Sequence, residues 1–277
     1  MVDADASECE ECNARRYRQE HYGWPMSAKQ EKRTRQARRN RPEREINATQ
    51  MIEAAKRIGV LDLSDVPETS VAQFAVGWLR AASAQAEAIA RLSLSGLDYA
   101  AAPNRRSFVE IAGRLQWLHA LDDRSGAPDA MVEIEQKLAK SHVAHINEMG
   151  LEMPPDFGGI EAVVTRSTAD KKIQVQAKNF TEAAKATEQS VGLYRAWREE
   201  TQFTHATAAL AVSFAPADEG TFGIGKPFVA DPMFDTLPMV YLLVLTYAVR
   251  ILLGEGSPQA AIDRIFSAYF AGTRAGL

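Results

Sequence analysis

The amino-acid sequence predicts an all-α fold, a multi-helix bundle of about seven or eight helices that follows a basic N-terminal leader. Three observations lead to this prediction. Beyond residue 45, apolar residues recur at spacings of three and four, which is the spacing of one helix face. No segment shows the sustained alternation of a half-buried strand. Alanine is abundant, and aromatic residues make up only 8% of the 277 residues.

The leader is expected to cover residues 1–45 and to be flexible, because it contains few large apolar residues. Its part from Lys29 to Arg44 holds eight basic residues against two acidic ones, Glu31 and Glu43; the eight are Lys29, Lys32, Arg33, Arg35, Arg38, Arg39, Arg41 and Arg44. Such a run can contact phosphates without sequence preference, or it can be a solvated tail. Cys9 and Cys12 form a lone CxxC with only His21 nearby, so a mobile polar tail is favoured over a metal or redox site.

The bundle is expected to form one domain over residues 46–277. A short helix runs from Ile46 to about Gly59. Ser70 can cap a long helix that stops near Gly96, and Asn104 can cap the next one. Pro128 stands where a first-turn proline belongs and opens a fourth helix.

Residues 153–160 are rich in Pro and Gly, interrupt the helical pattern and are the candidate hinge. Helices are expected again over residues 169–188 and, after Ser190, over residues 191–212. A Gly- and Pro-rich loop follows, and its length suggests a function. An apolar helix over residues 238–253 and a last helix opened by Ser257-Pro258 complete the bundle.

The composition indicates a soluble globular protein, with 46% hydrophobic and 25% charged residues. The formal net charge of −4 gives no overall attraction to polyanions. The most apolar run, residues 237–254, contains Tyr241, Thr246 and Arg250, which favours a buried core helix over a membrane span. We expect a cytoplasmic protein with no membrane partner, because the N-terminus has no apolar signal region.

No cofactor is expected. Residues 220–226 have the glycine and lysine spacing of a P-loop, but Pro227 follows the lysine and no buried strand precedes it. His142, His145 and Glu148 share one helix face and are able to offer three metal ligands. A solvated helix face is the commoner outcome, so a metal-dependent enzyme is the weakest alternative and no metal site is predicted.

The sharpest chemical feature lies in the helix expected over residues 191–212. Arg198 and His205 are seven residues apart, close to two turns, so both are predicted to project from one face with Thr201 between them. An imidazole can transfer a proton, and a guanidinium can hold a phosphate. Arg198, His205 and Thr201 are therefore the candidate catalytic residues.

A second feature is Arg106 and Glu110, four residues apart on a predicted helix. They can form an ordinary ion pair, or a polar contact inside the bundle that orients another site. Arg106 and Glu110, together with Trp197, are the candidate substrate-binding residues.

These residues carry a resemblance. Trp197, Arg198, Thr201 and His205 follow the order aromatic-Arg-x-x-Thr/Ser-x-x-x-His, which is similar to a motif in an uncharacterised family of helical bacterial proteins. In that family an upstream Arg-x-x-x-Glu helix precedes the motif, and Arg106 with Glu110 would correspond to it.

An arginine followed within a few residues by histidine also resembles the HEPN superfamily (higher eukaryote and prokaryote nucleotide-binding), which includes many toxin and defence ribonucleases. The resemblance covers about residues 70–255. It implies a homodimer in which two protomers bring their Arg and His pairs together. It also implies metal-independent RNA cleavage, in which the histidine moves a proton for 2′-hydroxyl attack and the arginine stabilises the phosphate.

Two hypotheses for function follow. The first is a HEPN-like protein that acts on RNA or is regulated by it. The second is a non-catalytic helical module that binds a partner protein or senses a ligand, in which Arg198 and His205 belong to a structural polar cluster.

Overall fold

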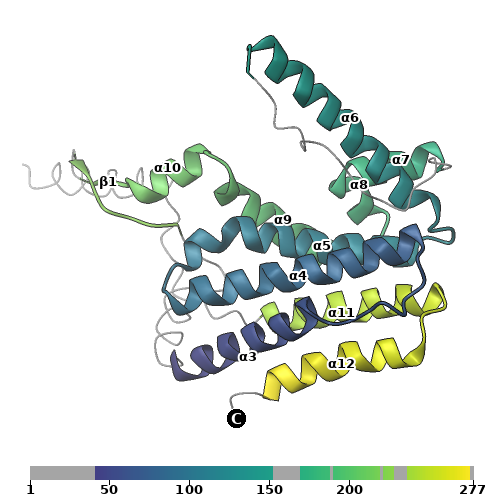
Figure 1. The fold of residues 1–277 in the computed structure, drawn as a ribbon. Helices are drawn as coiled ribbons and strands as arrows, with labels where there is room; N and C mark the ends of the chain where they lie inside the picture. The colour runs from purple at the N-terminus through teal and green to yellow at the C-terminus, as the bar shows by residue number, and fades with distance from the viewer. Residues whose placement is uncertain (1–40, 152–168, 188–189, 219–220, 228–235, 275–277) are drawn as a thin grey trace, which may run out of the picture.

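A computed structural model describes residues 41–151, 169–187, 190–218, 221–227 and 236–274 (Figure 1). The all-α prediction is confirmed. These residues form ten α-helices, one short 3₁₀ helix and a small two-stranded ribbon. The candidate hinge at residues 153–160 and the pair Cys9 and Cys12 lie outside the described residues.

Five helices form the main body of the bundle (Figure 1). They are α3 (Arg41–Gly59), α4 (Ser70–Leu94), α5 (Ala102–Ala120), α11 (Leu237–Gly254) and α12 (Gln259–Arg274). Helix α4 packs against α3, α5 and α11, and α12 packs against α3 and α11. The long α4 is therefore the central helix of this body.

The remaining helices cover α5 and extend beyond it (Figure 1). They are α6 (Gly126–Glu148), α7 (Lys171–Lys178), α8 (Phe180–Lys185), α9 (Val191–Thr204) and α10 (Ala208–Phe214). Helices α8 and α9 pack on α5, and α7 packs on α6. The 3₁₀ helix η1 (Asp98–Ala101) joins α4 to α5.

The core combines small residues on α4 with large ones on its neighbours. Ala75, Ala82 and Ala86 are fully buried and let the adjacent helices approach closely. Tyr241 of α11 is also fully buried, and its hydroxyl lies 2.6 Å from the hydroxyl of Ser83. This bond satisfies two polar groups that would otherwise be costly to bury.

Helix α11 supplies much of the core, as its composition predicts. Among the described residues, it is the one helix long and apolar enough to cross a membrane by length and composition, and half of it is buried in the bundle. Its exposed side carries Met239, Leu242 and Leu253.

Two expected helices are each broken in two, which explains ten helices where about eight were predicted. The helix expected over residues 169–188 is interrupted at Asn179, whose side chain accepts a hydrogen bond from the Thr181 amide at 2.9 Å and caps α8. The helix expected over residues 191–212 ends at Thr204, and Thr207 caps α10 by accepting from the Leu210 amide at 3.1 Å. In both places a polar side chain satisfies backbone amides better than a continuous helix does.

Three further boundaries differ from the prediction. Helix α3 is present from Arg41, within the expected leader. Thr69 rather than Ser70 caps α4, through a 3.1 Å bond from the Ala72 amide. Asn104 lies inside α5 and donates to Gln85 at 2.8 Å instead of capping the helix.

The loop expected after residue 214 contains a minimal antiparallel ribbon of β1 (Ala217–Asp218) and β2 (Thr221–Phe222). Ala217 lies opposite Phe222, and Asp218 lies opposite Thr221.

Candidate functional site between α5 and α9

Helices α5 and α9 lie side by side and run in opposite directions. Arg105 near the start of α5 pairs with Glu200 near the end of α9, whereas Gln116 near the end of α5 accepts a hydrogen bond from Ser190, which precedes α9. The two motifs identified in the sequence therefore face each other.

Four of the predicted residues meet between these helices, and we call Arg106, Glu110, Trp197 and Thr201 the α5–α9 cluster. The Trp197 indole N–H donates to Glu110 Oε2 at 2.9 Å. The Arg106 guanidinium lies over the Trp197 ring, 4.9 Å from its centroid, and its Nε donates to Thr201 Oγ1 at 3.2 Å. The Thr201 hydroxyl in turn donates to the Trp197 carbonyl at 2.7 Å. Each member thus has a partner within the cluster.

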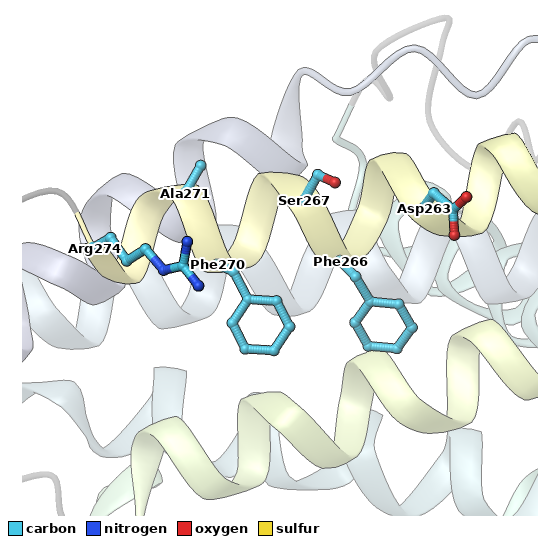
Figure 2. A pocket seen from close by; sticks show the side chains of 6 residues that line it. All are labelled: Asp263, Phe266, Ser267, Phe270, Ala271 and Arg274. Atoms are coloured by element: carbon cyan, nitrogen blue, oxygen red, sulfur yellow. The ribbon is translucent and has the colours of Figure 1, made fainter.

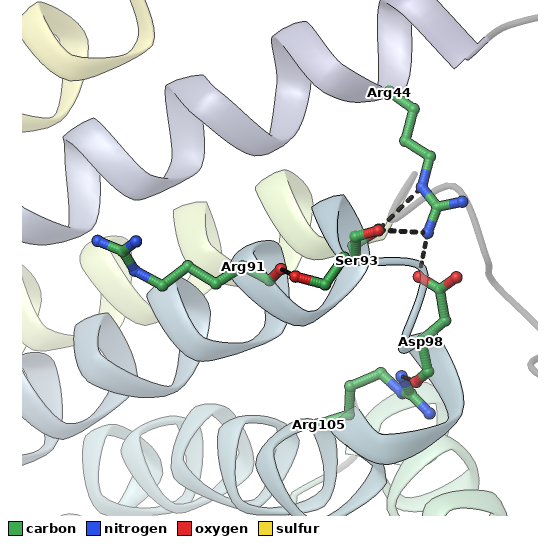
Figure 3. A network of polar contacts seen from close by, with 6 residues as sticks. Arg44, Arg91, Ser93, Asp98 and Arg105 are labelled. Carbon is green, nitrogen blue, oxygen red and sulfur yellow. Dashed lines mark hydrogen bonds and ion pairs between the residues drawn. The ribbon is translucent and has the colours of Figure 1, made fainter.

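One end of the cluster continues into an ion-pair network. Arg105 Nε lies 2.7 Å from Glu200 Oε1, and Arg105 Nη1 donates to the Asp98 carbonyl at 2.5 Å. The Asp98 carboxylate pairs with Arg44, whose Nε donates to Ser93 Oγ at 2.8 Å (Figure 3). This network ties α3, the α4–α5 connection and α9 together. Sequence patterns did not reveal it, because both ion pairs join residues far apart in the chain.

The other end of the cluster leads to a buried arginine. Arg114 Nη2 lies 3.8 Å from Glu110 Oε1, and Arg114 Nη1 donates to the Gln176 carbonyl at 2.8 Å. Burial lowers the pKa of Arg114, and the carboxylates of Glu110 and Glu135 oppose that shift. The Phe180 ring lies between the Arg114 guanidinium, 5.6 Å from its centroid, and the Trp197 ring, 5.2 Å away. The cluster is therefore continuous with α7 and α8.

Arg198 and His205 are not members of this cluster. Both are exposed, and the prediction that they share one helix is wrong. His205 follows the last residue of α9 with extended backbone angles, φ −114° and ψ 164°, because the chain turns there to begin α10. Within the described residues, neither side chain forms a hydrogen bond or an ion pair. The neighbouring Glu199 pairs with Arg195 at 2.9 Å.

The arrangement separates two roles. The α5–α9 cluster joins its four side chains by hydrogen bonds and a cation–π contact and fixes α9 against α5. Arg198 and His205 face solvent and have no competing protein partner in the described part of the chain. They are the two exposed residues of the motif, whereas Trp197 and Thr201 are half-buried.

Two surface grooves lie away from these residues. One runs along α12 and is lined by Phe266 and Phe270, with Asp263 and Arg274 at its ends (Figure 2). The other lies over α7 and α8 and is lined by lysines together with Gln176. No member of either motif lines these two grooves.

The histidines considered for metal binding are exposed on α6. His145 Nδ1 lies 3.5 Å from Glu148 Oε2, and the His142 side chain forms no hydrogen bond or ion pair within the described residues. Over the same described residues, no group of three or more His, Cys, Asp or Glu side chains is arranged to hold a metal ion.

Comparisons with models of protein families, with curated proteins and with solved structures find no match to this chain. The resemblance to HEPN-like proteins therefore depends on the motif residues themselves.

Proposed function

We propose that this chain is a HEPN-like helical protein that acts on RNA or is regulated by it. Arg198 and His205 would contact the RNA, and Thr201 would be a polar support. One observation carries the proposal. The two motifs, about ninety residues apart in the chain, meet in the α5–α9 cluster, and the cluster leaves Arg198 and His205 exposed.

The chemistry follows from these two side chains. His205 as general base would take the proton of an RNA 2′-hydroxyl, and the 2′-oxygen would form a bond to the adjacent phosphorus. The bond from phosphorus to the 5′-oxygen would break, the leaving oxygen would take a proton from water, and protonated His205 would return its proton to the solvent. Arg198 would stabilise the negative charge that develops on the phosphate oxygens. The products would be a 2′,3′-cyclic phosphate and a 5′-hydroxyl, with no metal ion required.

The proposal includes a homodimer. The resemblance implies that two protomers bring their Arg and His pairs together, and the exposure of both residues leaves them accessible to a second copy. Sedimentation of the full chain at several concentrations would measure this association.

The experiment that tests the function is incubation of the full chain with total RNA in EDTA, alongside H205A and R198A. We expect cleavage that survives EDTA and is lost in both variants. H145A is the matched control, because His145 is an exposed histidine on α6 and should leave cleavage unchanged. Absence of cleavage and of RNA binding at every protein concentration would contradict the proposal.

The second candidate function is a non-catalytic module that binds a partner protein or senses a ligand. It is favoured by the contacts that the four α5–α9 cluster residues make with one another, as in a structural cluster. Arg198 and His205, which this hypothesis placed in a structural polar cluster, are outside it. Helix α9 also ends between Arg198 and His205, so the two residues lack the fixed spacing that one helix would give them. RNA binding without cleavage would exclude catalysis but keep RNA as the ligand, whereas absence of both RNA binding and cleavage would support this second candidate.

A further inference from the structure

The groove over α7 and α8 has a volume of about 560 Å³ and three ammonium groups on its lining. Lys171 and Lys172 come from the first turn of α7, and Lys185 comes from the end of α8. The side chains of Val175 and Ala186 provide an apolar part of the wall. This volume is in the range of small-molecule sites in proteins.

The charge balance of the groove is positive. Glu182 is the one carboxylate on its lining, and it pairs with Lys185 at 2.8 Å. Lys171 and Lys172 form no ion pair with any residue that the structure describes. Nearby Asp170 is engaged as the cap of α7, where it accepts from the Ile173 amide at 2.8 Å. Two ammonium groups are thus left for an anionic ligand.

Gln176 adds an oriented neutral donor to these charges. It lines the groove although only 6% of its surface is exposed. Its Oε1 accepts from the Trp117 indole N–H at 2.9 Å, and an indole nitrogen can only donate, so the orientation of the amide is fixed. Its Nε2 has no hydrogen-bond partner among the described residues. An acceptor bound in the groove can take a hydrogen bond from this free amide donor.

We propose that this groove binds the phosphate group of a small phosphorylated molecule. The oxygens of the phosphate would accept from Lys171, Lys172 and Gln176 Nε2, and the rest of the molecule would lie on Val175 and Ala186. Ammonium groups and oriented amides bind phosphate through charge-assisted hydrogen bonds. The proposal does not depend on RNA cleavage.

The groove is also linked to the α5–α9 cluster. The backbone carbonyl of Gln176 accepts from Arg114, and Arg114 lies 3.8 Å from Glu110. A ligand held by Gln176 would therefore stabilise the contact of α7 with the cluster.

Calorimetric titration of the full chain with inorganic phosphate, adenosine monophosphate and adenosine tests the proposal. We expect both phosphates to bind and adenosine not to bind. Binding of inorganic phosphate but not of the nucleotide would assign the site to free phosphate. Equal binding of adenosine and its monophosphate, or no binding of either phosphate at millimolar concentration, would overturn the proposal.

Two variants locate the site. Q176E keeps the acceptor for Trp117 but replaces the amide donor with a carboxylate oxygen, so phosphate affinity should fall about tenfold or more. The double variant K171Q/K172Q should weaken binding to a similar extent, and it remains informative if Q176E does not fold. K178Q is the matched control, because Lys178 is an exposed lysine of the same helix that does not line the groove. A loss with K178Q equal to that with K171Q/K172Q would indicate general surface charge and contradict the assignment.

Discussion

At the residue scale, the indole N–H of Trp197 joins the two helices of the candidate site. W197F keeps a ring beneath Arg106 and beside Phe180 but removes the donor to Glu110 Oε2. We expect the free energy of unfolding in urea to fall by about 1 kcal/mol, since the bond is to a carboxylate that is partly exposed. W78F is the control, because Trp78 is a half-buried indole that forms no hydrogen bond within the described part of the chain. Equal losses in the two variants would contradict a specific role for the Trp197 bond.

Thr201 allows a similar test of the Arg106 contact. T201V keeps the shape of the side chain but loses the acceptor for Arg106 Nε and the bond to the Trp197 carbonyl. T204V loses only the matching bond to the Glu200 carbonyl, one turn away on the same helix. We expect T201V to lower the free energy of unfolding more than T204V, by about 0.5 to 1 kcal/mol. Thermal or urea unfolding measures the difference. A larger loss of stability in T204V than in T201V would contradict a stabilising role for the α5–α9 cluster.

Sequence patterns identified some of these residues and missed others. Arg106 and Glu110 were found because they are four apart on a helix, and Trp197 and Thr201 because they match a motif. Arg44, Arg105 and Glu200 were missed, since their ion pairs depend on which helices become neighbours. Gln176 was missed for the same reason: its importance comes from Trp117 and Arg114, which lie on another helix.

At the element scale, the end of α9 is the largest departure from the prediction for the site. The sequence predicts one helix over residues 191–212. Helix α9 instead ends at Thr204, because Thr207 caps a new helix, α10. Periodicity reports which face is buried, whereas the break depends on local competition for backbone amides. The relation of His205 to Arg198 therefore could not be obtained from their spacing.

At the element scale, two glycine-to-alanine variants test helix packing, because they are expected to change the free energy of unfolding in opposite directions. A Cβ at Gly272 of α12 would meet the backbone of Ala54 on α3, and backbone cannot move aside easily. G272A should therefore lower the free energy of unfolding by about 1 to 3 kcal/mol. A Cβ at Gly77 of α4 would have no atom within 4 Å, so G77A should raise it by about 0.5 to 1 kcal/mol. Urea unfolding of both variants measures the effects, and stabilisation by G272A would contradict the close packing of α3 and α12.

At the scale of the whole molecule, His119 makes stability depend on pH. Burial, followed by Arg124 and Arg250, lowers the pKa of His119 below its ordinary value of 6.5. The unfolded chain therefore binds more protons at this site, so stability is fully present above pH 6.5 and falls as the pH drops towards the folded pKa. H119Q should lose less stability than the wild type between pH 7.5 and pH 5, measured by urea unfolding at each pH. H142Q, at an exposed histidine, should keep the wild-type dependence, and an unchanged dependence in H119Q would contradict this assignment.

The fold class of the whole molecule was predictable because the three-and-four spacing of apolar residues persists through every long helix of the bundle. The arrangement of those helices was not, since periodicity gives the buried face of a helix and not its neighbour. The meeting of the Arg106–Glu110 helix with the Trp197–Thr201 helix was not predicted, because the family resemblance gave only the order of the two motifs along the chain.

The most direct test of the proposed function is cleavage of one labelled oligoribonucleotide by the full chain in EDTA, with the ends of the products identified. The proposal predicts a 2′,3′-cyclic phosphate and a 5′-hydroxyl. It also predicts loss of cleavage in H205A and at a site carrying a single 2′-deoxynucleotide. Products with a 3′-hydroxyl and a 5′-phosphate, undiminished cleavage by H205A, or an intact oligonucleotide at every protein concentration would contradict it.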